Sequence, residues 1–267
     1  MEDRPIGIFD SGIGGLTVAS ELHRVLPKES ILYFGDTAHL PYGDKSAETI
    51  VAYSKGITKL LMENGCKAIL IACNSASATA HDAVSILVGN DIPVFNVIDP
   101  VVEHVAHWFT TAKVGIIGTR ATITSDVYRK RLIERSPGVK VVQKSTSLLA
   151  PMIEEGFHDD SISNAVIHAY LEEHRFNGIK ALIPACTHYP MIADEIQNYL
   201  GTQVELINAP RIVAEDIQSK LEQLGLLSNS NDSKLRFLVS DLTPSFQKSS
   251  AIFFGEKVEL EEHRQST

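Results

Sequence analysis

The chain has few cysteines, with only three in 267 residues. Small secreted proteins are often held together by several disulfides, and three cysteines are too few for such a framework in a chain of this length. We therefore expect free thiols and a reducing, cytoplasmic location. The acidic N-terminal segment leads directly into an apolar strand pattern, which is not typical of a secretory signal peptide.

Long apolar runs and basic runs are also absent. No apolar stretch approaches the roughly 18 residues of a membrane-spanning helix, so we do not expect the protein to cross a membrane. The formal net charge is −9, from 24 Lys and Arg against 33 Asp and Glu. This charge disfavours nucleic acids and anionic membranes as partners.

Motifs for metals and common cofactors are missing as well. His104 and His107 share a predicted helix face, but no third ligand at metal-binding spacing accompanies them. The turn at residues 10–15, DSGIGG, departs from the GxGxxG pattern of dinucleotide-binding proteins. No lysine stands in a pattern suited to a pyridoxal Schiff base. We expect neither a metal ion nor an organic cofactor.

Short apolar runs alternate with longer amphipathic segments along the whole chain. The apolar runs predict strands at residues 5–9, 31–34, 68–72, 93–97, 114–117, 139–142, 181–184, 204–207 and 235–239. The amphipathic segments predict helices such as 16–26, 47–63, 76–89, 162–175 and 211–224. Continuous apolar runs joined by helices are typical of parallel sheets. The predicted fold class is therefore α/β with mainly parallel sheets.

Two segments of the chain resemble each other. Residues 65–74 (GCKAILIACN) align without gaps on residues 178–187 (GIKALIPACT), which places Cys73 opposite Cys186. This repeat predicts two pseudo-symmetric α/β domains with the functional site between them, although chance similarity between two core strands is the alternative. The predicted first domain comprises residues 1–97 and 208–267, and the second residues 98–207. A helix at 101–109 would bridge them.

The turns that follow the predicted strands are the expected place for a ligand, because open α/β sheets bind ligands beyond the carboxyl ends of their strands. Cys73 and Cys186 both lie at such ends, and each is followed by hydrogen-bonding residues and a helix. A helix N-terminus or a nearby imidazolium lowers the pKa of a thiol, so we expect two activated cysteines. Cys66 lies in a turn without polar neighbours and is interpreted as structural.

The acidic residues near these turns have two interpretations each. Asp10 and Asp36 follow the first and second predicted strands, where they would either cap a turn or bind a ligand ammonium or catalytic group. Glu154 also lies near a turn, a place that is more typical of a solvated acid. Sequence patterns alone leave these alternatives open.

Four motifs in this order, IGIFDSGIGGLTV, YFGDTAHLPYG, ACNSASA and ACTHYP, carry a family resemblance. The tail segments VSDLTPSF and FFGE extend it over nearly the whole chain. The sequence closely resembles bacterial glutamate racemases of the aspartate/glutamate racemase superfamily. The resemblance implies a cofactor-independent isomerase that interconverts L- and D-glutamate at an active site between two domains, and that supplies D-glutamate for peptidoglycan. A homodimer is compatible with it.

The same resemblance implies roles for individual residues. Cys73 and Cys186 would be the catalytic pair, with Cys73 acting on the D-enantiomer and Cys186 on the L-enantiomer. Asp36, Glu154 and His188 would tune the thiols. The implied substrate contacts are Asp10, Ser11, Tyr42, Gly43, Asn74, Ser75, Thr187 and His188.

Racemization gives a chemical reason for two thiols. A proton must leave one face of Cα and another must reach the opposite face, and two bases do this without moving the substrate. Since the motifs contain few cations, we expect hydroxyl, amide and backbone N–H groups to hold the carboxylates of the substrate. Alternatives are an aspartate or hydantoin racemase, a cysteine hydrolase with Cys186 as nucleophile and His188 as base, and a non-catalytic binding module.

Overall fold

The computed structural model describes residues 3–158 and 161–263, whose strands form two sheets. The first sheet has the order β10 (Leu260–Glu262), β9 (Leu235–Val239), β2 (Ile31–Gly35), β1 (Ile6–Asp10), β3 (Ala68–Ile71) and β4 (Val94–Asn96). The second has the order β6 (Lys140–Ser145), β5 (Lys113–Gly118), β7 (Ala181–Ala185) and β8 (Glu205–Leu206). Every strand pair recorded in the two sheets is parallel. The predicted α/β fold class is confirmed.

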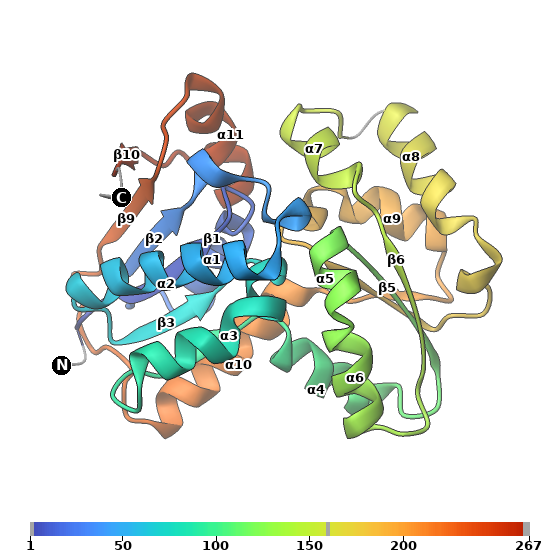
Figure 1. The fold of residues 1–267 in the computed structure, drawn as a ribbon, viewed down its shortest axis with the longest axis horizontal. Helices are drawn as coiled ribbons and strands as arrows, with labels where there is room; N and C mark the ends of the chain where they lie inside the picture. The colour runs from blue at the N-terminus through green and yellow to red at the C-terminus, as the bar shows by residue number, and fades with distance from the viewer. Residues whose placement is uncertain (1–2, 159–160, 264–267) are drawn as a thin grey trace.

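Helices connect the strands and pack against both sheets (Figure 1). They are α1 (Leu16–Val25), α2 (Ala47–Glu63), α3 (Asn74–Val88), α4 (Asp99–Trp108), α5 (Arg120–Ser125), α6 (Val127–Arg135), α7 (Leu149–Glu154), α8 (Ser161–Leu171), α9 (Ala193–Leu200), α10 (Ala209–Gln223) and α11 (Pro244–Phe254). Short 3-10 turns occur at η1 (Thr37–His39), η2 (Tyr42–Asp44), η3 (His174–Phe176) and η4 (Tyr189–Ile192). Among the described residues, no helix has the length and apolar character needed to span a bilayer.

The chain forms two halves that lie side by side (Figure 1). The first sheet takes its strands from both ends of the chain, and the second takes its strands from the middle. The chain passes from one sheet to the other between β4 and β5, and returns between β8 and β9. The domain boundaries at residues 97/98 and 207/208 fall within these two connections and stay a prediction.

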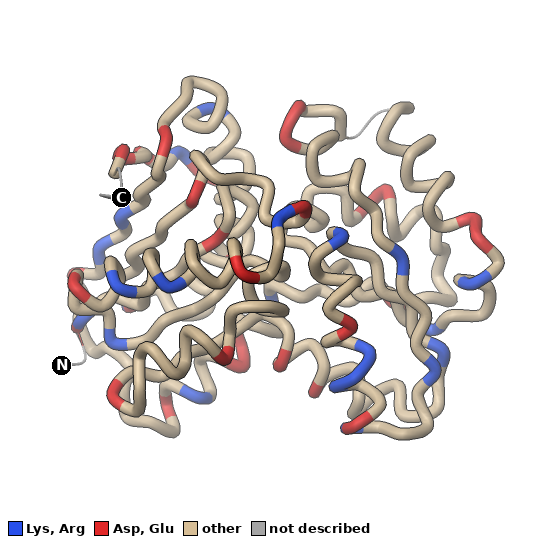
Figure 2. Tube along the Cα trace, viewed as in Figure 1, with Lys and Arg blue, Asp and Glu red and all other residues tan. Residues whose placement is uncertain are grey.

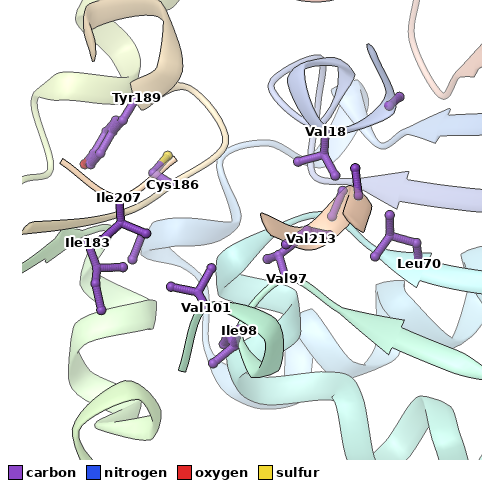
Figure 3. Packing of buried hydrophobic residues seen from close by; sticks show 14 of the residues in the cluster. Val18, Leu70, Val97, Ile98, Val101, Ile183, Cys186, Tyr189, Ile207 and Val213 are labelled. Atoms are coloured by element: carbon purple, nitrogen blue, oxygen red, sulfur yellow. The ribbon is translucent and has the colours of Figure 1, made fainter. Parts of the chain in front are cut away.

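Helix α4 joins the hydrophobic cores of the two halves. Val101 lies in α4 and Ile98 immediately precedes it, and both belong to one buried cluster that also contains Val18 of the first half and Ile183 of the second. Figure 3 shows the side chains of Val101 and Ile98 between the two groups. The buried apolar contact therefore runs from one sheet to the other, which fixes the relative positions of their strand ends.

Charged side chains are spread over both halves of the molecule. Figure 2 shows Lys and Arg interspersed with Asp and Glu along the trace, without a continuous basic stripe on the face in view. Strands β1 and β2, by contrast, are buried over their full lengths. Polar residues at the ends of the strands are therefore the place to look for a functional site.

Candidate active site

The carboxyl ends of strands from both sheets surround one cavity of about 200 Å³. Its lining residues are Ser11, Leu40, Pro41, Tyr42, Gly43, Cys73, Asn74, Ser75, Thr119, Ala150, Pro151, Glu154, Cys186, Thr187 and His188. All of the predicted site residues except Asp10 and Asp36 belong to this lining. The cavity is smaller than the roughly 300–1,000 Å³ typical of sites for drug-sized ligands, which favours a small metabolite.

Cys73 occupies the N-cap position of α3, directly after β3. Its side chain is buried, and Sγ donates a hydrogen bond of 3.6 Å to Ser11 Oγ. Burial and the nearby Asp10 carboxylate raise the pKa of Cys73 to about 12, although the Ala76 N–H and the Ser11 hydroxyl act in the opposite direction. Cys73 is therefore a protonated thiol near neutral pH. The expected net lowering of the Cys73 pKa is wrong, because burial outweighs the effect of the helix N-terminus.

Cys186 follows β7 and has a different environment. Its Sγ lies 3.7 Å from His188 Nδ1, and His188 Nε2 lies 2.8 Å from Glu154 Oε1. Burial disfavours the charged imidazole, but the hydrogen bonds to Cys186 and Glu154 outweigh it, so the pKa of His188 lies well above its ordinary value. His188 is thus an imidazolium at neutral pH, and this cation stabilises negative charge on the Cys186 sulfur.

The two sulfur atoms therefore line the same cavity but have different surroundings. Cys73 presents a proton donor, and Cys186 lies beside the His188 imidazolium. A molecule bound between them could lose a proton to one sulfur and gain a proton from the other. This arrangement is suited to general acid–base chemistry at a single carbon atom.

Asp10 lies behind the cavity and holds the first glycine-rich turn. It is fully buried, and it accepts hydrogen bonds from Gly12 N at 3.0 Å and from Thr187 Oγ1 at 3.4 Å. Burial raises the pKa of Asp10, while the His188 charge and these donors oppose the shift. Of its two interpretations, the structure displays the capping role, and direct contact with a substrate stays a prediction.

Asp36 also lies outside the cavity, where it orients Tyr42. Its carboxylate accepts hydrogen bonds from Tyr42 Oη at 2.5 Å and from Ser240 Oγ at 2.8 Å, and it pairs with His39 Nδ1 at 2.8 Å. Burial and the neighbouring Asp36 charge raise the pKa of Tyr42, so that its phenol stays protonated. Asp36 therefore orients the side chain of Tyr42 in η2, and in this structure it does not contact either thiol.

Thr119 is a lining residue that the sequence patterns did not predict. Its Oγ1 lies 2.8 Å from Ser75 Oγ, and this hydrogen bond joins α5 of the second half to α3 of the first. Gly43 approaches the same residue so closely that a β-carbon there would lie 2.8 Å from Thr119 Cβ. The signal that could have found Thr119 is its position, because it directly follows β5 as Ser11 directly follows β1.

Neutral donors make up the polar lining apart from His188 and Glu154. Hydroxyls of Ser11, Ser75, Thr119 and Thr187 and the amide of Asn74 surround the two thiols. In the part of the chain that the structure describes, no Lys or Arg lines this cavity. The nearest cations behave as surface residues: Arg120 pairs with Asp44 at 3.3 Å, and both side chains are exposed. The described residues contain no group of three or more His, Cys, Asp or Glu placed to hold a metal ion.

Comparison with known proteins agrees with this geometry. A glutamate racemase of Chlorobaculum parvum is 40% identical over 255 residues, which cover 95% of this chain and 93% of the relative. The crystal structure of glutamate racemase from Francisella tularensis, in complex with D-glutamate, superposes with a TM-score of 0.93 at 37% identity over 99% of both chains. Glutamate racemase from Thermus thermophilus, in complex with β-chloro-D-alanine, gives a TM-score of 0.88 at 35% identity over 98% of both chains.

The family model for Asp/Glu/Hydantoin racemase matches residues 14–217 of this sequence. That match covers most of both halves, including the two cysteines and the residues that follow them. With the near full-length relatives, it leads to one conclusion: the chain belongs to the Asp/Glu/Hydantoin racemase family.

Proposed function

We propose that this chain is a cofactor-independent glutamate racemase that transfers protons at Cα between Cys73 and Cys186. The observation that carries this proposal is that the two cysteines, from two different parallel sheets, line the same small cavity. The relatives named as glutamate racemases and the D-glutamate bound to the Francisella protein support glutamate as the substrate, in preference to aspartate or a hydantoin.

The proposed reaction removes one proton from Cα and adds another proton to its opposite face. With L-glutamate, the Cys186 thiolate takes the Cα proton, so that the Cα–H bond breaks and an S–H bond forms. The electron pair left on carbon delocalises into the α-carboxylate. The Cys73 thiol then gives its proton to the opposite face of Cα, which yields D-glutamate and a Cys73 thiolate. With D-glutamate, the same steps run in reverse.

Neutral hydrogen-bond donors stabilise the negative charge that develops during this reaction. Ser75 and Asn74 in the first turn of α3, and Thr187 after β7, provide hydroxyl and amide groups beside the thiols. Fixed donors in a closed site stabilise a developing charge without reorganising in the transition state. They also suit either enantiomer, because the substrate carboxylates have the same charge in both.

Thermodynamics limits how far the different environments of the two thiols can affect the kinetics in the two directions. L- and D-glutamate have equal free energies in water, so the equilibrium constant of the reaction is unity. The value of kcat/KM must therefore be equal in both directions at every pH. The different environments of Cys73 and Cys186 can change kcat and KM between directions, but only by the same factor.

The cellular role that we propose is the supply of D-glutamate for peptidoglycan in the cytoplasm. The three cysteines of the chain are free thiols, and a reducing compartment would keep them in that form. A homodimer remains part of this proposal.

A cysteine hydrolase is the second candidate, because the Cys186–His188–Glu154 arrangement resembles a nucleophile with its base and orienting acid. Such an enzyme would form a covalent acyl-enzyme through Cys186 and would give Cys73 no role. The fate of the Cα hydrogen separates the two functions.

Isotope exchange provides the first test. In D2O, the purified protein without added cofactor should convert L-glutamate to D-glutamate that carries deuterium at Cα, because the donating thiol has exchanged with solvent. During the initial rate, the remaining L-glutamate should keep its protium. Mass spectrometry with chiral separation measures both pools. Product that retains the original protium would exclude the two-thiol mechanism, and an absence of turnover with glutamate would exclude the proposed substrate.

Single cysteine substitutions provide the second test. Cys73→Ser and Cys186→Ser should each reduce kcat by at least about 10³-fold, since a hydroxyl is a far weaker base than a thiolate and general acid–base groups contribute about 10²–10⁴-fold. Cys66→Ala is the matched control: Cys66 is buried against Gly7 outside the cavity, so this variant should retain near wild-type kcat. Loss of activity only in Cys186→Ser would favour the hydrolase.

The pH dependence tests the role of Glu154. Glu154→Gln removes a carboxylate that raises the pKa of His188, so the imidazolium should deprotonate at lower pH. The basic limb of kcat/KM should then begin at a lower pH, so that the variant is slower than wild type on that limb. Profiles from pH 6 to 10 measure this shift. Glu155→Gln, an exposed neighbour, is the control, and identical profiles for all three proteins would contradict the assigned role.

A further inference from the structure

Tyr128 connects the second half of the molecule to the first turn of α3. It lies in α6, is 2% exposed, and donates a hydrogen bond of 2.8 Å from its hydroxyl to Asn74 Oδ1. Burial and the nearby Asp99 carboxylate raise the pKa of Tyr128, so its phenol keeps its proton and acts as a donor. Asn74 itself lines the cavity together with the two cysteines.

This contact decides which end of the Asn74 amide is available to a ligand. An asparagine side chain has one acceptor oxygen and one NH2 group with two donors. Because the Tyr128 hydroxyl engages the oxygen, the NH2 group is the end left for the cavity. Tyr128 pairs with Asn74 Oδ1, whereas no hydrogen-bond acceptor in the described part of the chain pairs with Asn74 Nδ2.

The local backbone places Tyr128 for this contact. Helices α5 and α6 meet at Asp126, which has a φ of +59°, a left-handed conformation that is uncommon outside glycine. Gln143 Nε2 of β6 donates to Asp126 Oδ1 at 2.5 Å and holds this corner. From the second half, Thr119 at the start of α5 contacts Ser75, and Tyr128, directly after the bend, contacts Asn74.

We propose that Tyr128 is a positioning residue that fixes the Asn74 amide with its NH2 group toward a carboxylate of the substrate. Among the described residues, the cavity lining lacks Lys and Arg, so neutral donors such as this amide contribute to the recognition of anionic groups. With the amide reversed, an oxygen would face the carboxylate and repel it. This inference rests on the proposed function and deepens it, because it concerns binding of the same substrate.

A double-mutant cycle tests this role. Tyr128→Phe removes only the hydroxyl, and it should raise KM for both L- and D-glutamate by about tenfold, with a smaller change in kcat. In an Asn74→Ala background, the same substitution should leave KM unchanged, because no amide remains to be oriented. Tyr170→Phe, which removes a hydroxyl that accepts from Leu148 N and lies away from Asn74, is the control and should keep wild-type KM.

Two results would overturn the inference. An unchanged KM in Tyr128→Phe would show that the hydroxyl does not act on binding. An equal rise in KM in the wild-type and Asn74→Ala backgrounds would show that Tyr128 acts independently of the amide, as a packing residue does. Failure of the proposed function itself is distinguishable, because the wild-type protein would then not racemize glutamate.

Discussion

The mechanism that we propose requires two bases to reach one carbon atom from opposite sides. Parallel sheets place the carboxyl ends of their strands at one edge. In this molecule, the edges of two such sheets share one cavity, to which β3 contributes Cys73 and β7 contributes Cys186. The apolar contacts around α4 hold the two edges together. Two similar α/β halves thus each contribute one cysteine to the cavity, as the proposed chemistry of mirror-image substrates requires.

Burial excludes water from the cavity, and it also makes the ionisation of a thiol less favourable. Removing a thiol from water disfavours its charged form, as the raised pKa of Cys73 shows. Cys186, by contrast, lies 3.7 Å from the His188 ring, whose other nitrogen pairs with Glu154. The two thiols thus line one cavity but have different electrostatic surroundings. The hydroxyl and amide groups of the lining add neutral donors to this arrangement.

Much of the fold and part of the site could be predicted from the sequence. The nine predicted strands all occur, because buried parallel strands appear as continuous apolar runs. Strand β10 was not predicted, since Glu261 and Glu262 are exposed and leave no apolar run. The repeat identified the two cysteines, and the position of Thr119 directly after β5 was the available signal for that residue. Tyr128 had no such signal, because it lies within a helix and reaches the site only through the bend at Asp126. The direction of the Cys73 pKa shift depends on burial and on Asp10, which only the folded structure shows.

The most direct measurement is a crystal structure of this protein with glutamate bound at a pH near neutrality. We predict that Cα lies between Cys73 Sγ and Cys186 Sγ, with each sulfur within about 4 Å on opposite faces, close to the roughly 3–3.5 Å of a reactive approach. A complex in which only one sulfur approaches Cα, or in which both approach the same face, would contradict the two-thiol mechanism.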